Sequence, residues 1–291
     1  MAENTFAEAK PKKYLLIYLL ISFGICWGMC LFYVIANDFM TRTFGELTLE
    51  NPLVLFALNV PGVATFLMYF LYGGWKAVRD FLKTLIPRVK DLKWIPIVIA
   101  VMCIYLVCVR LGCMAVGIKV PELEYTFPQM LKIFLLNFFG ETGMIGQVFG
   151  WFGFMLPYMQ AKTKSNIRAG LWTGFAFGMF LLPGYVFSSF ETATAFPFYL
   201  VQMMLFSVCA TYVLNEVKGN LLFFLLTFWI AATGSKVRLY DFIPSVQIVQ
   251  IVLFLIMFGV LYFVFKKRYA GKKPEEVLQM FPDFLYQGSR A

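Results

Sequence analysis

Phe149-Gly150-Trp151-Phe152-Gly153-Phe154-Met155-Leu156-Pro157 is the stretch that decides the fold expected for this chain. It holds two glycines three positions apart among large apolar side chains, and it contains no charged residue. Small residues at such close spacing let helices in a membrane approach one another closely. The stretch is therefore predicted to lie where several membrane helices pack together.

Composition places the whole chain in a membrane. Of its 291 residues, 60% are hydrophobic and 14% are charged, whereas about 25% are charged in a typical soluble domain. Apolar runs of roughly 20 residues recur, which is the length needed to cross a hydrocarbon core. The sequence predicts an all-α, polytopic integral membrane protein, one transmembrane domain over residues 1–291 with about eight transmembrane helices, the fourth continuing as an amphipathic turn through Met159. The predicted spans are Tyr14–Ala36, Pro52–Tyr72, Trp94–Gly117, Phe127–Gly146, Arg168–Phe187, Phe196–Val213, Leu221–Gly234 and Val246–Phe265.

The distribution of positive charge predicts the orientation. With both termini in the cytoplasm, 19 of the 25 Lys and Arg residues fall on the cytoplasmic side, four fall in the opposite loops, and two lie within or beside spans. An excess of Lys and Arg in cytoplasmic loops is the rule for membrane proteins. The net charge of +9 is therefore interpreted as a topology signal and a contact for anionic lipid headgroups, and not as a nucleic-acid interface. The tail over about residues 266–291 is expected to be cytoplasmic.

A second amphipathic element is predicted between the second and third spans. From Gly73 to Ile86 the apolar residues are spaced to form one helix face, with Lys and Arg on the other. Such a helix is expected to lie in the plane of the membrane interface. Pro87 should end it, and Trp94 should anchor the next span near the headgroups.

The cysteines and the missing histidines limit the metal chemistry that this chain can perform. It contains no histidine. Cys26 and Cys30 share a helix face, but two thiols alone make a poor zinc site, so packing is the favoured role for all six cysteines. These are Cys26, Cys30, Cys103, Cys108, Cys113 and Cys209, all in predicted spans.

Three motifs give the chain a family resemblance. Gly150-Trp151-Phe152-Gly153 and the following apolar residues up to Pro157 resemble the Gly-Trp-Arg-Gly-x-Leu-Leu-Pro stretch of CPBP intramembrane metalloproteases, the Abi family of CAAX-processing and bacteriocin-processing proteases. Phe177-Gly178-Met179-Phe180-Leu181-Leu182-Pro183 resembles the family's Trp-Gly-x-Trp-His-Leu-Pro motif. Gly219-Asn220-Leu221-Leu222 resembles the Gly-Ser-Leu-Leu that begins its seventh span. The resemblance implies a CPBP-like core over about residues 61–232.

The resemblance also implies that the reactive groups are lost. In the family, paired glutamates and two histidines bind a metal or polarise a water that attacks a carbonyl. The corresponding positions in this chain are Gln147 and Val148 for the glutamates, Phe152 for the arginine, Leu181 and Phe228 for the histidines, and Ala232 for an Asn or Asp. The zinc expected in active members is not expected here, and the protein resembles a pseudoprotease.

Glu141 leaves two interpretations open, because an ionised carboxylate at membrane depth is costly. It either lines an internal cavity, or it is paired with Arg110 or protonated. Gln147 and Gln202 are expected to form hydrogen bonds between helices. The vestigial active site is predicted to remain as an apolar pocket formed by Glu141, Gln147, Phe152, Leu181 and Phe228.

The function expected from the resemblance is binding without proteolysis. The ligand would be a peptide such as a bacteriocin, a lipidated protein or another membrane protein, in a bacterial cell membrane. One alternative is a membrane-embedded enzyme, a divergent intramembrane endopeptidase or an acyl or lipid transferase, that uses Glu141 or a cysteine. A transporter is less favoured, because the spans carry few polar residues and show no matched interruptions in two halves.

Overall fold

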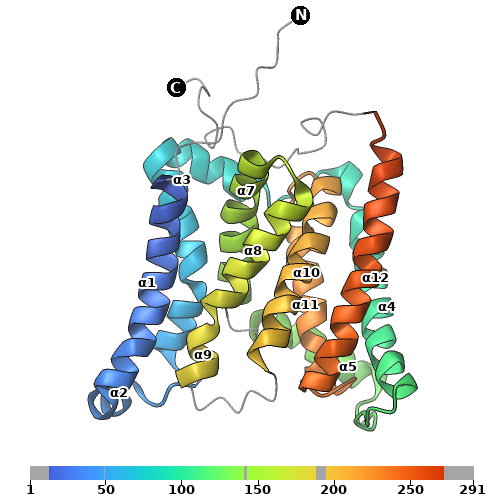
Figure 1. Ribbon diagram of the computed structural model, residues 1–291, viewed down its shortest axis with the longest axis horizontal. Coiled ribbons are helices and arrows are strands. Elements are labelled where there is room, and N and C mark those ends of the chain that lie inside the picture. The colour runs from blue at the N-terminus through green and yellow to red at the C-terminus, as the bar shows by residue number, and fades with distance from the viewer. Residues whose placement is uncertain (1–12, 49, 141–142, 188–194, 272–291) are drawn as a thin grey trace, which may run out of the picture.

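A computed structural model describes residues 13–48, 50–140, 143–187 and 195–271, and across these residues every regular element is a helix, which confirms the all-α class (Figure 1). In chain order the elements are α1 (Lys13–Ile35), α2 (Asn37–Phe44), α3 (Pro52–Lys83), η1 (Val89–Asp91), α4 (Trp94–Ala115), α5 (Phe127–Gly140), α6 (Met144–Gln147), η2 (Val148–Met155), α7 (Leu156–Thr163), α8 (Asn166–Phe180), α9 (Leu182–Phe187), α10 (Phe196–Glu216), α11 (Leu221–Lys236) and α12 (Pro244–Arg268).

Five of the described helical segments are long and apolar enough to cross a membrane, which supports a multi-pass membrane protein. The segments are Tyr14–Ile35, Pro52–Leu71, Val89–Ala115, Phe196–Glu216 and Pro244–Arg268; α11 is apolar but shorter. The first residues of α1 and the last residues of α12 lie at the same end of the bundle (Figure 1). We call this the basic end (residues 73–93, 159–168, 214–220 and 266–271), and the opposite end the far end (residues 36–48, 50–51, 116–126 and 237–243).

Helix α3 contains both the second predicted span and the predicted amphipathic helix. It begins at Pro52 behind Asn51, whose side-chain oxygen accepts a hydrogen bond of 2.8 Å from the Leu53 amide. Gly74 breaks it with φ 61, a backbone conformation that glycine adopts at little cost. The part after Gly74 lies across the basic end of the bundle (Figure 1), and its Phe81 is buried.

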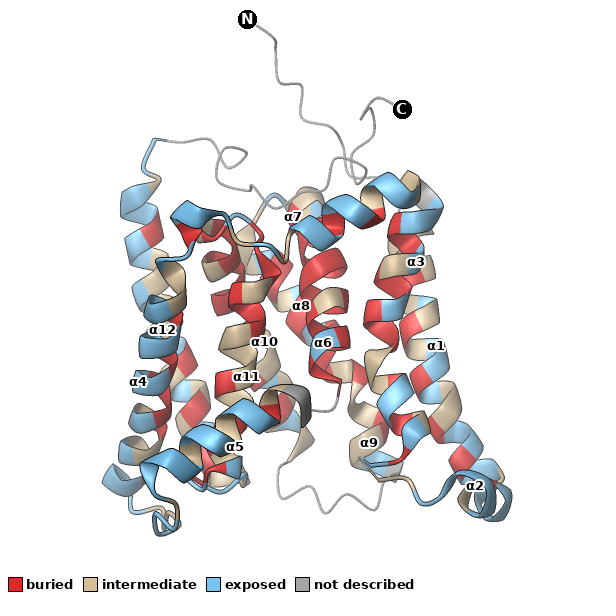
Figure 2. Cartoon of the chain, turned by 180° about the vertical axis from the view of Figure 1, so that it is seen from behind, coloured by how far each residue is buried: buried red, intermediate tan, exposed pale blue. Residues whose placement is uncertain are grey.

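The fourth predicted span is wrong as a continuous helix. Helix α5 ends at Gly140 and slants across the far end of the bundle, while α6, η2 and α7 run on toward the basic end (Figure 2). Gly143 precedes α6 with φ 78, a left-handed conformation that a continuous helix excludes. Hydropathy alone does not reveal this break, because the residues on both sides of it are apolar.

The motif Phe149–Met155 lies within η2, which is a π-helix and not the α-helix expected. Hydrogen bonds in such a turn run from i to i+5, and these turns are rare and often occur at functional sites. A Cβ atom at Gly150 would overlap Pro61 of α3, so the backbones of η2 and α3 are in contact. The close helix packing predicted from the two glycines is present.

The fifth predicted span is also divided. Helix α8 ends at Phe180, and α9 begins at Leu182, directly before Pro183. A proline ring clashes with the carbonyl group four residues earlier in a continuous helix, which accounts for the break at Leu181. The break at Leu181 thus lies two residues before Pro183.

Candidate functional site

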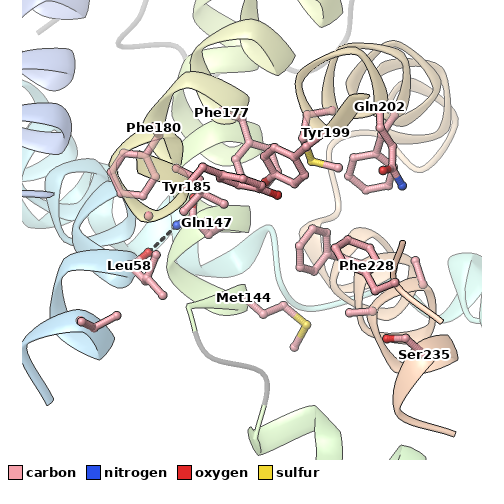
Figure 3. Close-up of a pocket in the computed structure, with 18 of the residues that line it drawn as sticks. Leu58, Met144, Gln147, Phe177, Phe180, Tyr185, Tyr199, Gln202, Phe228 and Ser235 are labelled. Carbon is pink, nitrogen blue, oxygen red and sulfur yellow. Dashed lines mark hydrogen bonds between the residues drawn. The ribbon is translucent and has the colours of Figure 1, made fainter. Parts of the chain in front are cut away.

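A cavity of about 740 Å³ occupies the half of the bundle nearer the far end (Figure 3). Its walls come from α1, α3, α4, α6, α8, α9, α10, α11 and α12, and they are mainly aromatic and aliphatic. Among the described lining residues, only Lys236 and Phe242 are exposed. Lys236 is the last residue of α11 and Phe242 lies in the loop that follows, next to and within the far end, and we call this exposed part of the lining the mouth. The volume is in the range of small-molecule sites.

Aromatic residues of η2 pack behind the side chains that line the cavity. Trp151, Phe152 and Phe154 are 0% exposed. The Trp151 ring stacks on Phe177 at a centroid distance of 6.1 Å, and Phe152 lies 4.1 Å from the Phe224 ring. These rings therefore pack behind the cavity wall and support it, and no residue of η2 lines the cavity itself.

Gln147 lies on the cavity wall and joins two helices. Its Nε2 donates a 2.6 Å hydrogen bond to the Leu58 carbonyl group of α3, drawn in Figure 3. Its Oε1 accepts a hydrogen bond from the indole nitrogen of Trp151. An amide can donate and accept in this way, whereas an ionised carboxylate can only accept. The interhelical role expected for this side chain is confirmed.

The structure brings most of the sequence-predicted positions to one cavity. Gln147, Leu181, Phe228 and Ala232 all line it. Phe152 does not; it is buried behind the wall, where it packs against the rings of Phe206 and Phe224. The i to i+5 hydrogen bonding of η2 alters the direction of its side chains relative to an α-helix. The sequence prediction for Phe152 assumed α-helical geometry and so did not include this change.

The other residues assigned to the site lie elsewhere. Val148 is fully buried and does not line the cavity, and Glu141 falls outside the described residues. Arg110 donates hydrogen bonds of 3.0 Å to the backbone carbonyl groups of Pro121 and Leu239. It therefore ties α4 to two loops of the far end, and both interpretations of Glu141, cavity lining and pairing with Arg110 or protonation, stay open.

A cluster of amides and phenols forms the polar end of the cavity. Gln202 of α10 donates to Gln250 of α12 at 3.1 Å and accepts from Gln247 at 3.2 Å. The phenols of Tyr105 and Tyr240 lie against the Gln250 amide. The sequence indicated an interhelical role for Gln202 but not this cluster. The signal that could have revealed it is the i, i+3 spacing of Gln247 and Gln250 in an apolar helix.

Apart from the exposed Lys236, the described lining residues offer hydrogen bonds from neutral groups and contact with apolar groups. In the described part of the chain, no group of three or more Cys, Asp or Glu side chains is placed to hold a metal ion. Cys26 and Cys30 of α1 line the cavity, and the Cys26 Sγ lies 3.9 Å from the Phe180 carbonyl oxygen. No known protein-family model and no curated protein matches the chain. The resemblance to CPBP proteases thus rests on the sequence motifs themselves.

Proposed function

We propose that this protein is a CPBP-type integral membrane protein without protease activity, and that it binds a membrane-borne ligand in the cavity. The ligand is an apolar peptide, the lipid group of a lipidated protein, or a segment of another membrane protein. The main support is that Gln147, Leu181, Phe228 and Ala232, the positions that correspond to reactive residues of the family, line the same cavity.

The side chains at these positions favour binding over hydrolysis. Leu181, Phe228 and Ala232 have no group that could hold a metal or accept a proton, and the amide of Gln147 is engaged with Leu58 and Trp151. Apolar ligand groups would lose no hydrogen bonds against such walls. A polar ligand group left without a hydrogen-bonding partner there would cost about 1–3 kcal/mol of lost solvation free energy.

Eight membrane crossings with both termini in the cytoplasm complete the proposal. Beside the five long helices, the segments from α5 to α7, from α8 to α9, and α11 would supply the other three crossings. This count places the start of α1 and the end of α12 on the same side, in agreement with their common end in Figure 1, and the positive charge favours the cytoplasm for that side.

A cavity-filling substitution tests the binding function. Ala232→Phe adds a ring to the cavity wall, whereas Ala100→Phe adds the same ring to an exposed position of α4. Native mass spectrometry of the gently purified protein should detect a bound ligand in the wild type and in Ala100→Phe, and loss of that ligand in Ala232→Phe. Equal ligand retention by Ala232→Phe and Ala100→Phe would contradict binding in this cavity.

One observation favours an enzyme as a second candidate. The thiols of Cys26 and Cys30 line the cavity, where a thiol could carry an acyl group during acyl transfer. An acyl thioester at either residue, detected by mass spectrometry and released by hydroxylamine, would support the second candidate. Its absence in protein purified from growing cells and incubated with an acyl donor would contradict it.

A further inference from the structure

The cavity extends across the bundle more than along it. One end is lined by Cys26, Met29 and Cys30 of α1, and the other by Tyr105 of α4 and Gln250 of α12. Helix α1 lies on one side of the bundle, and α4 and α12 lie on the other, in both views (Figures 1 and 2). Other helices of the bundle lie between α1 and α12, and the axes of neighbouring helices are about 8–10 Å apart. A cavity that reaches from α1 to α12 is therefore roughly 20 Å long.

The two ends of this cavity differ in polarity. At the α12 end, the Gln202 amide donates to Gln250, and the Gln250 amide lies beside the phenols of Tyr105 and Tyr240. The α1 end presents thiols and a thioether, which are weak hydrogen-bonding groups. Between them the wall is aromatic, and it includes the rings of Phe177, Phe206 and Phe228. A ligand that satisfies both ends has a hydrogen-bonding head and an apolar chain.

The lining also limits the charge of the ligand. Among the described lining residues, Lys236 alone is charged, and it lies at the mouth, where its Nζ donates a 2.6 Å hydrogen bond to Asn137 Oδ1. A charged group inside a membrane protein is stable only with an opposite charge or extensive hydration. The amide end supplies neutral donors and acceptors, so it suits a head without charge.

We infer that the ligand is an uncharged single-chain lipid, with a hydroxyl or amide head at the Gln202–Gln250 end and a hydrocarbon chain that reaches the Cys26 end. This inference rests on the proposed binding function and deepens it by naming the ligand class. Neutral hydrogen bonds at the head select the molecule from the pool of charged membrane lipids, and the aromatic wall holds the chain. The proposal predicts one orientation of the ligand in the cavity.

Photo-crosslinking tests this inference on the full-length protein in nanodiscs. Two alkyne-tagged monoacylglycerol probes carry a diazirine, one at the chain terminus and one at the carbon next to the glycerol ester. Peptide mapping should place the first crosslink on α1 near residues 26–30, and the second on α4 or α12 near residues 105 and 250. A free fatty acid and a lysophosphatidylcholine with the same chain and diazirine should label the protein at least tenfold less. Stronger labelling by either charged probe, or the reverse orientation, would overturn the inference.

Substitutions in the amide cluster give a second, independent readout. Gln202→Met and Gln250→Met keep the side-chain length and remove the hydrogen-bonding groups, and each should weaken monoacylglycerol labelling about tenfold, the loss expected for one to two neutral hydrogen bonds. Gln160→Met is the matched control, because Gln160 is a buried amide in a hydrogen-bonded cluster outside the cavity. Labelling unchanged in both cluster variants would contradict the assigned head site.

The outcomes separate this inference from the proposed function. If Ala232→Phe removes a co-purifying ligand but no monoacylglycerol probe labels the cavity, the ligand class is wrong and the binding function stands. If Ala232→Phe changes neither ligand retention nor labelling, the binding function itself fails. Thermal unfolding of every variant identifies those that lose labelling because they no longer fold.

Discussion

Gln147 shows at the scale of one residue how a single buried amide joins neighbouring helices. The side chain is 5% exposed, and its amide bonds α6 to the Leu58 carbonyl group and to Trp151. A glutamate would retain its shape but would lose the donor to Leu58 when ionised. It would also place a charge at membrane depth, where carboxylates are strongly disfavoured. The local structure therefore now depends on the amide.

We expect Gln147→Glu to destabilise the protein by about 1–3 kcal/mol, the free energy usually lost when a buried carbonyl group loses its donor. Gln129→Glu is the control, because Gln129 is exposed and its side-chain oxygen accepts a hydrogen bond from the Thr126 amide, a role that a carboxylate retains. Thermal unfolding of both variants in the same detergent measures the difference. If Gln147→Glu unfolds at the wild-type temperature, the amide does not hold the helices as described.

At the same scale, the sequence predicted which residues would meet but not which of them would face the cavity. The family resemblance of three motifs predicted that Gln147, Leu181 and Phe228 would lie together, and all three line the cavity. It failed for Phe152, since the π-helical turn of η2 is set by packing against α3 and has no local sequence pattern of its own. The amide cluster was missed because Gln202 and Gln250 are 48 positions apart, and only tertiary structure pairs them.

At the scale of elements, glycines set how closely the helices pack. A Cβ atom at Gly174 of α8 would lie 2.5 Å from both the carbonyl oxygen of Met203 and the Cα of Met204 on α10. These are backbone atoms, which cannot move without separating the two helices. Gly24 of α1, in contrast, has no neighbouring atom within 4 Å of an added Cβ. The two positions are equally apolar in sequence and differ only in their surroundings.

The expected result of Gly174→Ala is a destabilisation of about 1–3 kcal/mol, the usual effect of overpacking a close contact. Gly24→Ala should instead stabilise the protein by up to about 1 kcal/mol, because alanine has the higher helix propensity. Unfolding of both variants by a denaturing detergent provides the comparison. The same small effect at both positions would show that α8 and α10 do not need to approach closely.

The elements that the sequence predicted well are those with a continuous apolar run and a clear end. The helix after Gly74 was predicted because its spaced charges and apolar residues are local signals, but it ends at Lys83, before the Pro87 that was expected to end it. The break between Gly140 and Met144 was not predicted, because apolar residues continue across it. Hydropathy shows how long an apolar segment is but not whether the helix changes direction within it. Gly143 is the one local signal for a left-handed backbone at this point. Single glycines are common in membrane helices, so one glycine does not predict a break.

The whole molecule is polarised along the axis of its helices. The basic end holds Lys76, Arg79 and Lys83 on the part of α3 after Gly74, whereas the exposed lining residues of the cavity are next to and within the far end. If the basic end is cytoplasmic, the exposed lining residues of the cavity face the outer side of the membrane. Orientation and function are therefore linked, and the orientation can be measured on its own.

Cysteine labelling in a background without the six native cysteines measures this orientation. Lys119 lies in the loop after α4 at the far end, and Lys162 lies near the end of α7 at the basic end; both are exposed. In intact cells, a membrane-impermeant maleimide should label Lys119→Cys, and it should label Lys162→Cys only after the membrane is permeabilised. The physical reason is that Lys and Arg near the ends of spans are retained in the cytoplasm during insertion. Labelling of Lys162→Cys in intact cells would reverse the topology and place the mouth of the cavity in the cytoplasm, while labelling of both would show that the two ends do not face opposite sides of a membrane.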